Sequence, residues 1–168
     1  MKTITLDDFL SCTKAEVLSK NNSEFSGIGF DTRINLTGKL FIAIKGEKHD
    51  AHDFLKEAVE KGATALVVHQ ETEFLNKLKT QTKSPITLIK VPDTLIALHD
   101  LARFSRRRSA SLVIGVAGSN GKTTSKEFCA SVIGAHRKVH YSKGSFNNHW
   151  GVPFTILAEP EKTEIMIL

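Results

Sequence analysis

The residues with the clearest chemical potential form one glycine-rich run at positions 115–124, GVAGSNGKTT. It follows an apolar stretch and precedes a helical pattern, and a strand, a glycine loop and a helix in that order are the setting of a phosphate site. Glycines let backbone N–H groups approach a polyphosphate closely, while the helix N-terminus adds unpaired donors and partial positive charge. The residues expected to bind a nucleotide are Gly118, Ser119, Asn120, Gly121, Lys122, Thr123 and Thr124.

Two of these side chains have distinct expected roles. Lys122, the candidate catalytic residue, would reach the β and γ phosphates of ATP, and the Thr123 hydroxyl would ligate Mg²⁺. The spacing departs from G-x-x-x-x-G-K-[ST] because Val116 stands at the first glycine position. The alternative is a glycine turn that only caps a helix. The loop does not distinguish a hydrolase, a kinase and an ATP-driven ligase, because all three use this cradle.

The elements around the loop predict an α/β protein with two domains, residues 1–108 and 109–168. Apolar runs and helical spacing alternate along the chain, and the polar segment 108–111 between the two parts suits a linker. Asp93 and Pro153 mark helix starts, and Gly62 marks a helix end. The expected strands are 40–44, 65–68, 86–91, 112–116, 138–141 and 164–168, and the expected helices are 5–20, 52–61, one that follows Asp93, 122–134 and 151–158.

Composition excludes several classes of protein. Of 168 residues, 40% are apolar and 24% charged, which is typical of a globular chain and not of a disordered one. The formal charge of +5 favours anionic partners without choosing among them. No apolar run reaches the ~18 residues of a membrane helix, and the N-terminus has no secretory pattern, so we expect a cytoplasmic protein without membrane insertion. The basic cluster at 103–108 closes a predicted helix, and no nucleic-acid-binding signature accompanies it.

Four segments, taken in order, resemble the Mur ligases, the enzymes that form amide bonds in the peptidoglycan precursor. The phosphate loop continues as GSNGKTTSKE at 118–127, and its Lys126-Glu127 extension is most similar to the member that adds D-alanyl-D-alanine to UDP-N-acetylmuramoyl-tripeptide. The other matching segments are Asp31-Thr32-Arg33, GKLFIAIKG at 38–46 with DAHDF at 50–54, and Asn147-Asn148 with Gly151-Val152-Pro153.

This resemblance implies a small UDP-substrate-binding α/β domain, followed by the start of a mainly parallel-sheet ATPase domain. The implied reaction forms an acyl phosphate on the tripeptide carboxylate, which the amine of D-alanyl-D-alanine attacks. Three alternatives remain open: Asp31 caps a turn with Arg33 in solvent, His52 only starts a helix, and Asn147-Asn148 is only a loop. The residues implied to bind the UDP-linked substrate are Asp31, Thr32, Arg33, Lys45, Gly46, His52, Asn147 and Asn148.

The resemblance covers the first domain of the family and the opening of the second. The metal-binding glutamate and histidine and the modified lysine of the family have no counterpart in this sequence, so we expect the 168-residue chain alone to be an inactive monomer. Two other functions stay open. One is the related ligase that adds the third peptide residue, and the other is a nucleotide-binding or UDP-substrate-binding module without catalysis.

Overall fold

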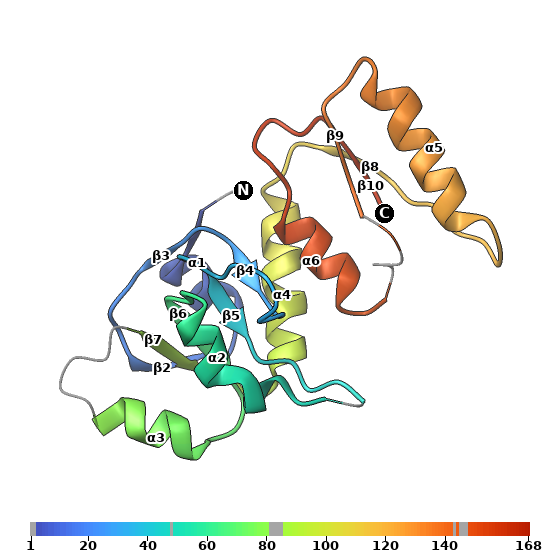
Figure 1. Cartoon of the computed structure of the whole chain (residues 1–168). Coiled ribbons are helices and arrows are strands. Elements are labelled where there is room, and N and C mark those ends of the chain that lie inside the picture. Colours follow the sequence, from blue (N-terminus) through green and yellow to red (C-terminus); the bar gives the residue numbers. More distant parts are fainter. Residues whose placement is uncertain (1–2, 48, 81–85, 143, 145–147) are drawn as a thin grey trace. The chain divides into compact units, whose positions relative to one another are not determined.

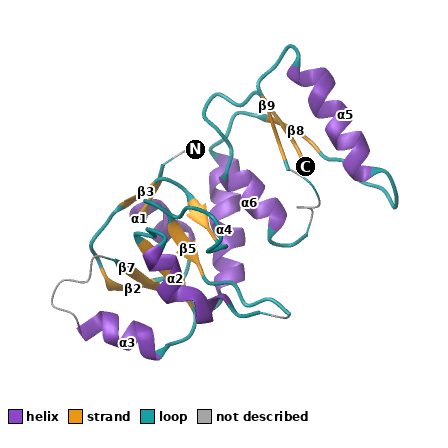
Figure 2. Ribbon diagram, in the orientation of Figure 1, coloured by secondary structure: helices purple, strands orange, loops and turns teal. Residues whose placement is uncertain are grey.

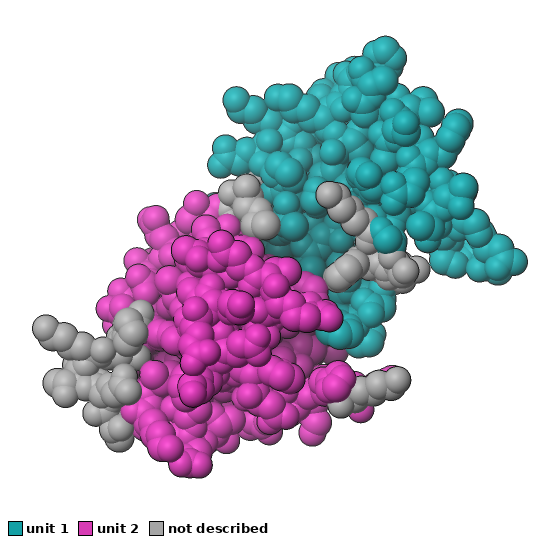
Figure 3. Space-filling model, viewed as in Figure 1, with its two compact units in different colours: residues 1–2, 102–168 teal, residues 3–101 magenta. Residues whose placement is uncertain are grey.

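The computed structural model describes residues 3–47, 49–80, 86–142, 144 and 148–168. The chain divides into two compact units, residues 3–101 and residues 102–168, which we call the N-terminal unit and the C-terminal unit (Figure 3). The division falls inside one helix, α4 (Thr94–Arg107), seven residues before the predicted domain boundary at 108 and 109. That boundary stays a prediction, and the two units are described separately.

The N-terminal unit contains a five-stranded sheet with the order β2-β7-β6-β5-β4 (Figure 1). All neighbouring strands are parallel except β2, which runs antiparallel to β7. The strands of this sheet are β2 (Glu16–Ser19), β4 (Ile28–Gly29), β5 (Leu40–Ile42), β6 (Ala65–Val68) and β7 (Thr87–Lys90). A separate antiparallel pair is formed by β1 (Ile4–Thr5) and β3 (Glu24–Phe25). The helices are α1 (Leu6–Cys12), η1 (Ala51–Phe54), α2 (Leu55–Glu60), α3 (Glu73–Thr80) and the first part of α4.

Both faces of this sheet are buried, as parallel sheets require. On one face, Phe41 of β5 and Leu66 of β6 pack in one cluster with Leu55 of α2 and Leu75 of α3. The alternate side chains point to the other face and are equally buried, because successive residues of a strand face opposite ways. They are Leu40, Ile42, Ala65, Val67 and Ile89. Helix α4 lies on that side of the sheet (Figure 1), and its Ala97, Leu98 and Leu101 are buried.

Local signals set two of the helix ends. The Asp93 carboxylate accepts hydrogen bonds from the backbone N–H groups of Leu95 and Ile96, at 2.7 and 2.9 Å, so the predicted cap of α4 is present. Gly62 ends α2 with a φ of +92°, and a Cβ there would lie 2.9 Å from Thr37 Oγ1. Glycine is therefore required at this position by both backbone conformation and space.

The C-terminal unit has a three-stranded parallel sheet with the order β8-β10-β9. Its helices, α5 and α6, are purple in Figure 2. Helix α5 connects β8 to β9, and α6 connects β9 to β10. Phe154, Leu157 and Met166 are buried, whereas Leu112 and Phe128 are 65% and 70% exposed. The elements are β8 (Leu112–Ile114), α5 (Lys122–Gly134), β9 (Val139–Tyr141), α6 (Gly151–Leu157) and β10 (Ile165–Ile167).

The predicted α/β class with parallel sheets is confirmed, and most predicted elements appear within one or two residues. The helix predicted over 5–20 is wrong in its second half, because α1 ends at Cys12 and residues 16–19 pair with β7 as strand β2. In the segment 108–111, the carbonyl oxygens of Ser109 and Ser111 accept hydrogen bonds from Arg106. None of the helices in the described part of the chain has the length and apolarity of a membrane span.

Candidate functional site

The glycine loop lies between β8 and α5, as predicted, and residues 117–121 are exposed. Gly121 precedes α5 with a φ of +73° and has no side-chain cap. The first N–H bonded back along the helix is that of Ser125, which donates to Gly121 O at 2.9 Å. Helix geometry therefore leaves the N–H groups of Lys122, Thr123 and Thr124 without acceptors inside the helix. This end of α5 offers backbone donors to an anion.

A cation and two hydroxyl groups lie at the same helix end. The Lys122 ammonium folds over the loop and donates to Gly118 O at 2.5 Å and to Ser119 O at 3.2 Å. Thr123 and Thr124 are exposed, and a hydroxyl oxygen suits a hard cation such as Mg²⁺. The described residues contain no cluster of three His, Cys, Asp or Glu that would hold a metal. The Thr123 hydroxyl would supply one oxygen ligand to a Mg²⁺ ion at this helix end.

One turn further along α5, Lys126 is only 5% exposed, which the sequence did not indicate. Its ammonium donates to Ser142 Oγ at 3.0 Å and to Gly144 O at 2.8 Å. The lysine thereby fixes the segment after β9 beside the helix that carries the phosphate loop. Asn148 Oδ1 accepts from the backbone N–H of Gly151, the first residue of α6, at 2.8 Å. Asn147 lies outside the described residues.

The remaining predicted site residues gather at the carboxyl edge of the sheet in the N-terminal unit. The strands β4, β5, β6 and β7 are parallel, so the segments that follow them meet at one edge, where α/β proteins bind ligands. Asp31, Thr32 and Arg33 follow β4, the segment 43–50 follows β5, His69 follows β6, and Thr94 follows β7. This arrangement unites residues that are up to 63 positions apart in sequence.

Asp31 and Arg33 form an exposed ion pair. Arg33 donates to the Asp31 carboxylate through Nε at 2.9 Å and through a terminal nitrogen at 2.6 Å, and its backbone N–H also bonds to Asp31 at 2.9 Å. The hydrogen bonds from the Arg33 side chain are the main cause of the lowered pKa of Asp31. Asp31 thus caps its turn, as the alternative interpretation expects, and Thr32 between them is buried. The Arg33 side chain is 87% exposed and can also meet a solvent-borne anion.

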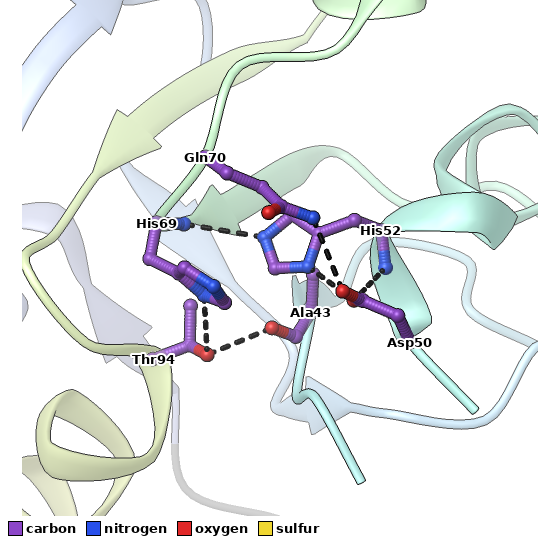
Figure 4. Close-up of polar contacts among 6 residues, drawn as sticks. All are labelled: Ala43, Asp50, His52, His69, Gln70 and Thr94. Carbon is purple, nitrogen blue, oxygen red and sulfur yellow. Dashed lines mark hydrogen bonds and ion pairs between the residues drawn. The ribbon is translucent and has the colours of Figure 1, made fainter. Parts of the chain in front are cut away.

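A chain of hydrogen bonds links the segment after β5 to β6 (Figure 4). Asp50 accepts from the backbone N–H of His52 at 2.9 Å and lies 2.6 Å from its Nδ1, and the N–H of His69 donates to His52 Nε2 at 3.2 Å. Because Nε2 is an acceptor, the ring proton is on Nδ1 and faces Asp50. Gln70 donates to the other Asp50 oxygen at 3.1 Å. Both ring nitrogens of His52 are therefore engaged within the chain.

Burial is the main cause of the lowered pKa of His52, and it outweighs the neighbouring Asp50 carboxylate. Asp53 also raises the pKa of this ring, and His69 lowers it. Burial by itself would raise the pKa of Asp50, but the hydrogen bonds from His52 keep that pKa below its usual range. The pair is thus a neutral imidazole beside an ionised carboxylate at neutral pH.

This arrangement predicts a pH-dependent stability for the N-terminal unit. The pKa of His52 is lower in the folded chain than the ordinary histidine value of about 6.5 that applies to the unfolded chain. Below about pH 6.5 the unfolded chain therefore binds a proton at His52 that the folded chain excludes, and the free energy of unfolding decreases as the pH falls. We expect thermal unfolding midpoints to fall more steeply from pH 7.5 to 5.5 in the wild type than in His52→Gln, as measured by circular dichroism. Parallel profiles would contradict this assignment.

Comparison with known proteins decides the family. Residues 24–106 match the family described as "Mur ligase family, catalytic domain", and residues 116–168 match "Mur ligase middle domain". The chain belongs to the Mur ligase family. The resemblance seen in the sequence is thereby confirmed.

Three individual relatives of this Mur ligase chain have names of one member of the family. The UDP-N-acetylmuramoyl-tripeptide--D-alanyl-D-alanine ligase of Bacillus subtilis is 41% identical over 142 residues, which are 84% of this chain and 30% of the relative. The crystal structure of MurF from Acinetobacter baumannii matches 100% of this chain with a TM-score of 0.85 and 26% identity, and the chain covers 36% of it. MurF from Thermotoga maritima, solved in complex with ADP, matches 84% of the chain with a TM-score of 0.68 and 30% identity, and 31% of that protein is covered. The chain spans about a third of the length of these relatives.

The structure adds three polar residues that the sequence did not single out as site residues. His69 and Thr94 join the carboxyl edge only because β6 and β7 lie beside β5, and no local pattern shows that strand order. Lys126 was noted only as part of the resemblance, and an isolated lysine on a helix is ordinarily exposed. Strand order and burial are long-range properties, so these residues required the fold.

Proposed function

We propose that this Mur ligase chain belongs to an enzyme that joins D-alanyl-D-alanine to UDP-N-acetylmuramoyl-tripeptide with the hydrolysis of ATP. The observation that carries the proposal is the 41% identity, across 84% of the chain, to a B. subtilis protein of that name. The exposed loop at the start of α5 supplies the matching chemistry.

In this proposal ATP binds at the glycine loop, 118–124. The N–H groups at the start of α5 and the Lys122 ammonium face the β and γ phosphates, and the Thr123 hydroxyl contributes to holding Mg²⁺. When bound, Mg²⁺ neutralises negative charge on the transferring phosphoryl group. The T. maritima MurF ligase was solved in complex with ADP, which supports nucleotide binding within this family.

The UDP-linked substrate binds, in the same proposal, at the carboxyl edge of the N-terminal unit. Arg33 and Lys45 are exposed cations there, suited to a pyrophosphate, and Gly46 leaves room for a close approach. His52 is buried with both ring nitrogens engaged, so we assign it a positioning role through Asp50 and His69.

The reaction has two steps. An oxygen of the tripeptide carboxylate attacks the γ-phosphorus of ATP, which gives an acyl phosphate and ADP. The amine of D-alanyl-D-alanine then attacks the acyl carbon, and the tetrahedral intermediate expels inorganic phosphate and loses a proton. Lys122 stabilises charge on the transferred phosphoryl group, and such electrostatic stabilisation is often the largest catalytic effect.

Calorimetric titration tests this proposal directly. We expect MgATP and UDP-N-acetylmuramoyl-tripeptide each to bind the 168-residue chain, and no release of phosphate that depends on D-alanyl-D-alanine. Failure of both ligands to bind would overturn the proposed sites. Phosphate release dependent on the dipeptide would instead show that the chain alone is a competent ligase.

A further inference from the structure

His69 is held in one orientation by contacts at both of its ends. Its backbone N–H donates to His52 Nε2 at 3.2 Å, and the two imidazole rings meet edge to face with centroids 4.3 Å apart. Its ring Nδ1 lies 3.3 Å from Thr94 Oγ1 (Figure 4). The ring is only partly buried at the end of β6. A side chain fixed before a ligand arrives loses little conformational entropy on binding.

The hydroxyl of Thr94 determines which nitrogen of His69 carries the proton. Thr94 is 2% exposed, and its Oγ1 donates its one hydrogen to the carbonyl oxygen of Ala43 at 2.8 Å. Towards His69 the same oxygen can therefore only accept, so the neutral His69 ring has its proton on Nδ1. Its Nε2 is then a hydrogen-bond acceptor, and it has no partner within the described part of the chain.

We propose that His69 is a specificity-determining residue, whose Nε2 accepts a hydrogen bond from an N–H or O–H group of the UDP-linked substrate. This inference rests on the proposed function, because it places that substrate at the carboxyl edge where β4, β5, β6 and β7 end. Such donors exist on the uridine as an imide N–H and ribose hydroxyls, and on the muramoyl-peptide as amides and hydroxyls. A ligand without a donor at this point leaves Nε2 unsatisfied, which is how a polar site discriminates.

Two variants separate this role from a structural one. His69→Gln keeps an amide group near the position of Nε2, whereas His69→Asn keeps one only near the position of Nδ1. We expect His69→Asn to weaken the binding of UDP-N-acetylmuramoyl-tripeptide about five- to thirtyfold, the effect of one lost hydrogen bond, and His69→Gln to restore binding to within about threefold of the wild type. Both should bind MgATP like the wild type, because the glycine loop belongs to the other unit.

Calorimetry with two partial ligands, UDP and the muramoyl-tripeptide without UDP, identifies the donor. A selective loss for UDP assigns the donor to the uridine, and a selective loss for the muramoyl-tripeptide assigns it to the sugar or peptide. Equal binding of the intact substrate by the wild type and His69→Asn would overturn the inference and leave the proposed function standing. No binding of that substrate by the wild type would instead count against the proposed function.

Discussion

Replacing Lys122 by alanine is expected to weaken the binding of MgATP about ten- to hundredfold, which corresponds to the loss of charge-assisted hydrogen bonds to phosphate. The Lys122 ammonium lies over the loop carbonyls of Gly118 and Ser119, within reach of an anion held by the N–H groups of α5. The side chain is not part of the buried core, so folding should be unchanged. Isothermal titration calorimetry with the 168-residue chain measures the effect.

Lys56→Ala is the matched control, because it removes the same charge from α2, where the side chain is 75% exposed and pairs with Glu60. It should bind MgATP like the wild type, which separates local phosphate contact from a change in net charge. UDP-N-acetylmuramoyl-tripeptide should bind all three proteins equally. If Lys122→Ala retains wild-type affinity for MgATP, the loop does not bind phosphate through this lysine and the nucleotide assignment fails.

The phosphate loop was predictable because its structure is set locally. A short apolar strand, three glycines and a helix-forming run are contiguous, and α5 begins at Lys122 and ends at Gly134 as the pattern predicts. The cap at Asp93 is local in the same sense, because its carboxylate bonds to a backbone N–H two residues further on, and the positive φ of Gly62 is a local property of the helix end. Such signals can be recognised in the sequence without knowledge of the tertiary fold.

The errors come from long-range pairing. Residues 16–19 satisfy helical spacing, yet they form β2 because the edge of β7 is available for antiparallel pairing with Val17 and Ser19. Phe54 lies within the helix predicted over 52–61, but a 3₁₀ turn at 51–54 precedes α2 and leaves this side chain 41% exposed. Tertiary context overrides local propensity in both places.

The candidate substrate edge was predictable only in part, for the same reason. The resemblance identified Asp31, Lys45 and His52, but the order of the parallel strands is what unites them with His69 and Thr94. That order also explains why His52 is buried: its ring lies between Asp50 of its own loop and the backbone of the neighbouring strand's end. The motif thus identifies candidate residues, and the order of the strands in the sheet determines which of them can contact a ligand.

The sheet that creates this edge depends on its core, and Phe41→Ala tests that dependence with the largest expected loss of stability. Phe41 is 0% exposed in the interior strand β5 and packs in one cluster with Leu66 and Leu88, so its truncation should cost about 3–5 kcal/mol of the free energy of unfolding. Phe54→Ala makes the same chemical change at a 41% exposed position in the same unit and should cost less than about 1 kcal/mol.

Hydrogen exchange of β5, β6 and β7 is the measurement of choice, because the chain's single tryptophan, Trp150, and single tyrosine, Tyr141, both lie in the C-terminal unit and their fluorescence does not report on this core. A small domain has a total stability of roughly 5–15 kcal/mol, so the loss at Phe41 would expose a substantial fraction of molecules to exchange. UDP-N-acetylmuramoyl-tripeptide should then bind Phe41→Ala more weakly, since part of its binding energy must refold the sheet. Equal exchange in the Phe41→Ala and Phe54→Ala proteins would show that the cluster around Phe41 does not hold the carboxyl edge in place.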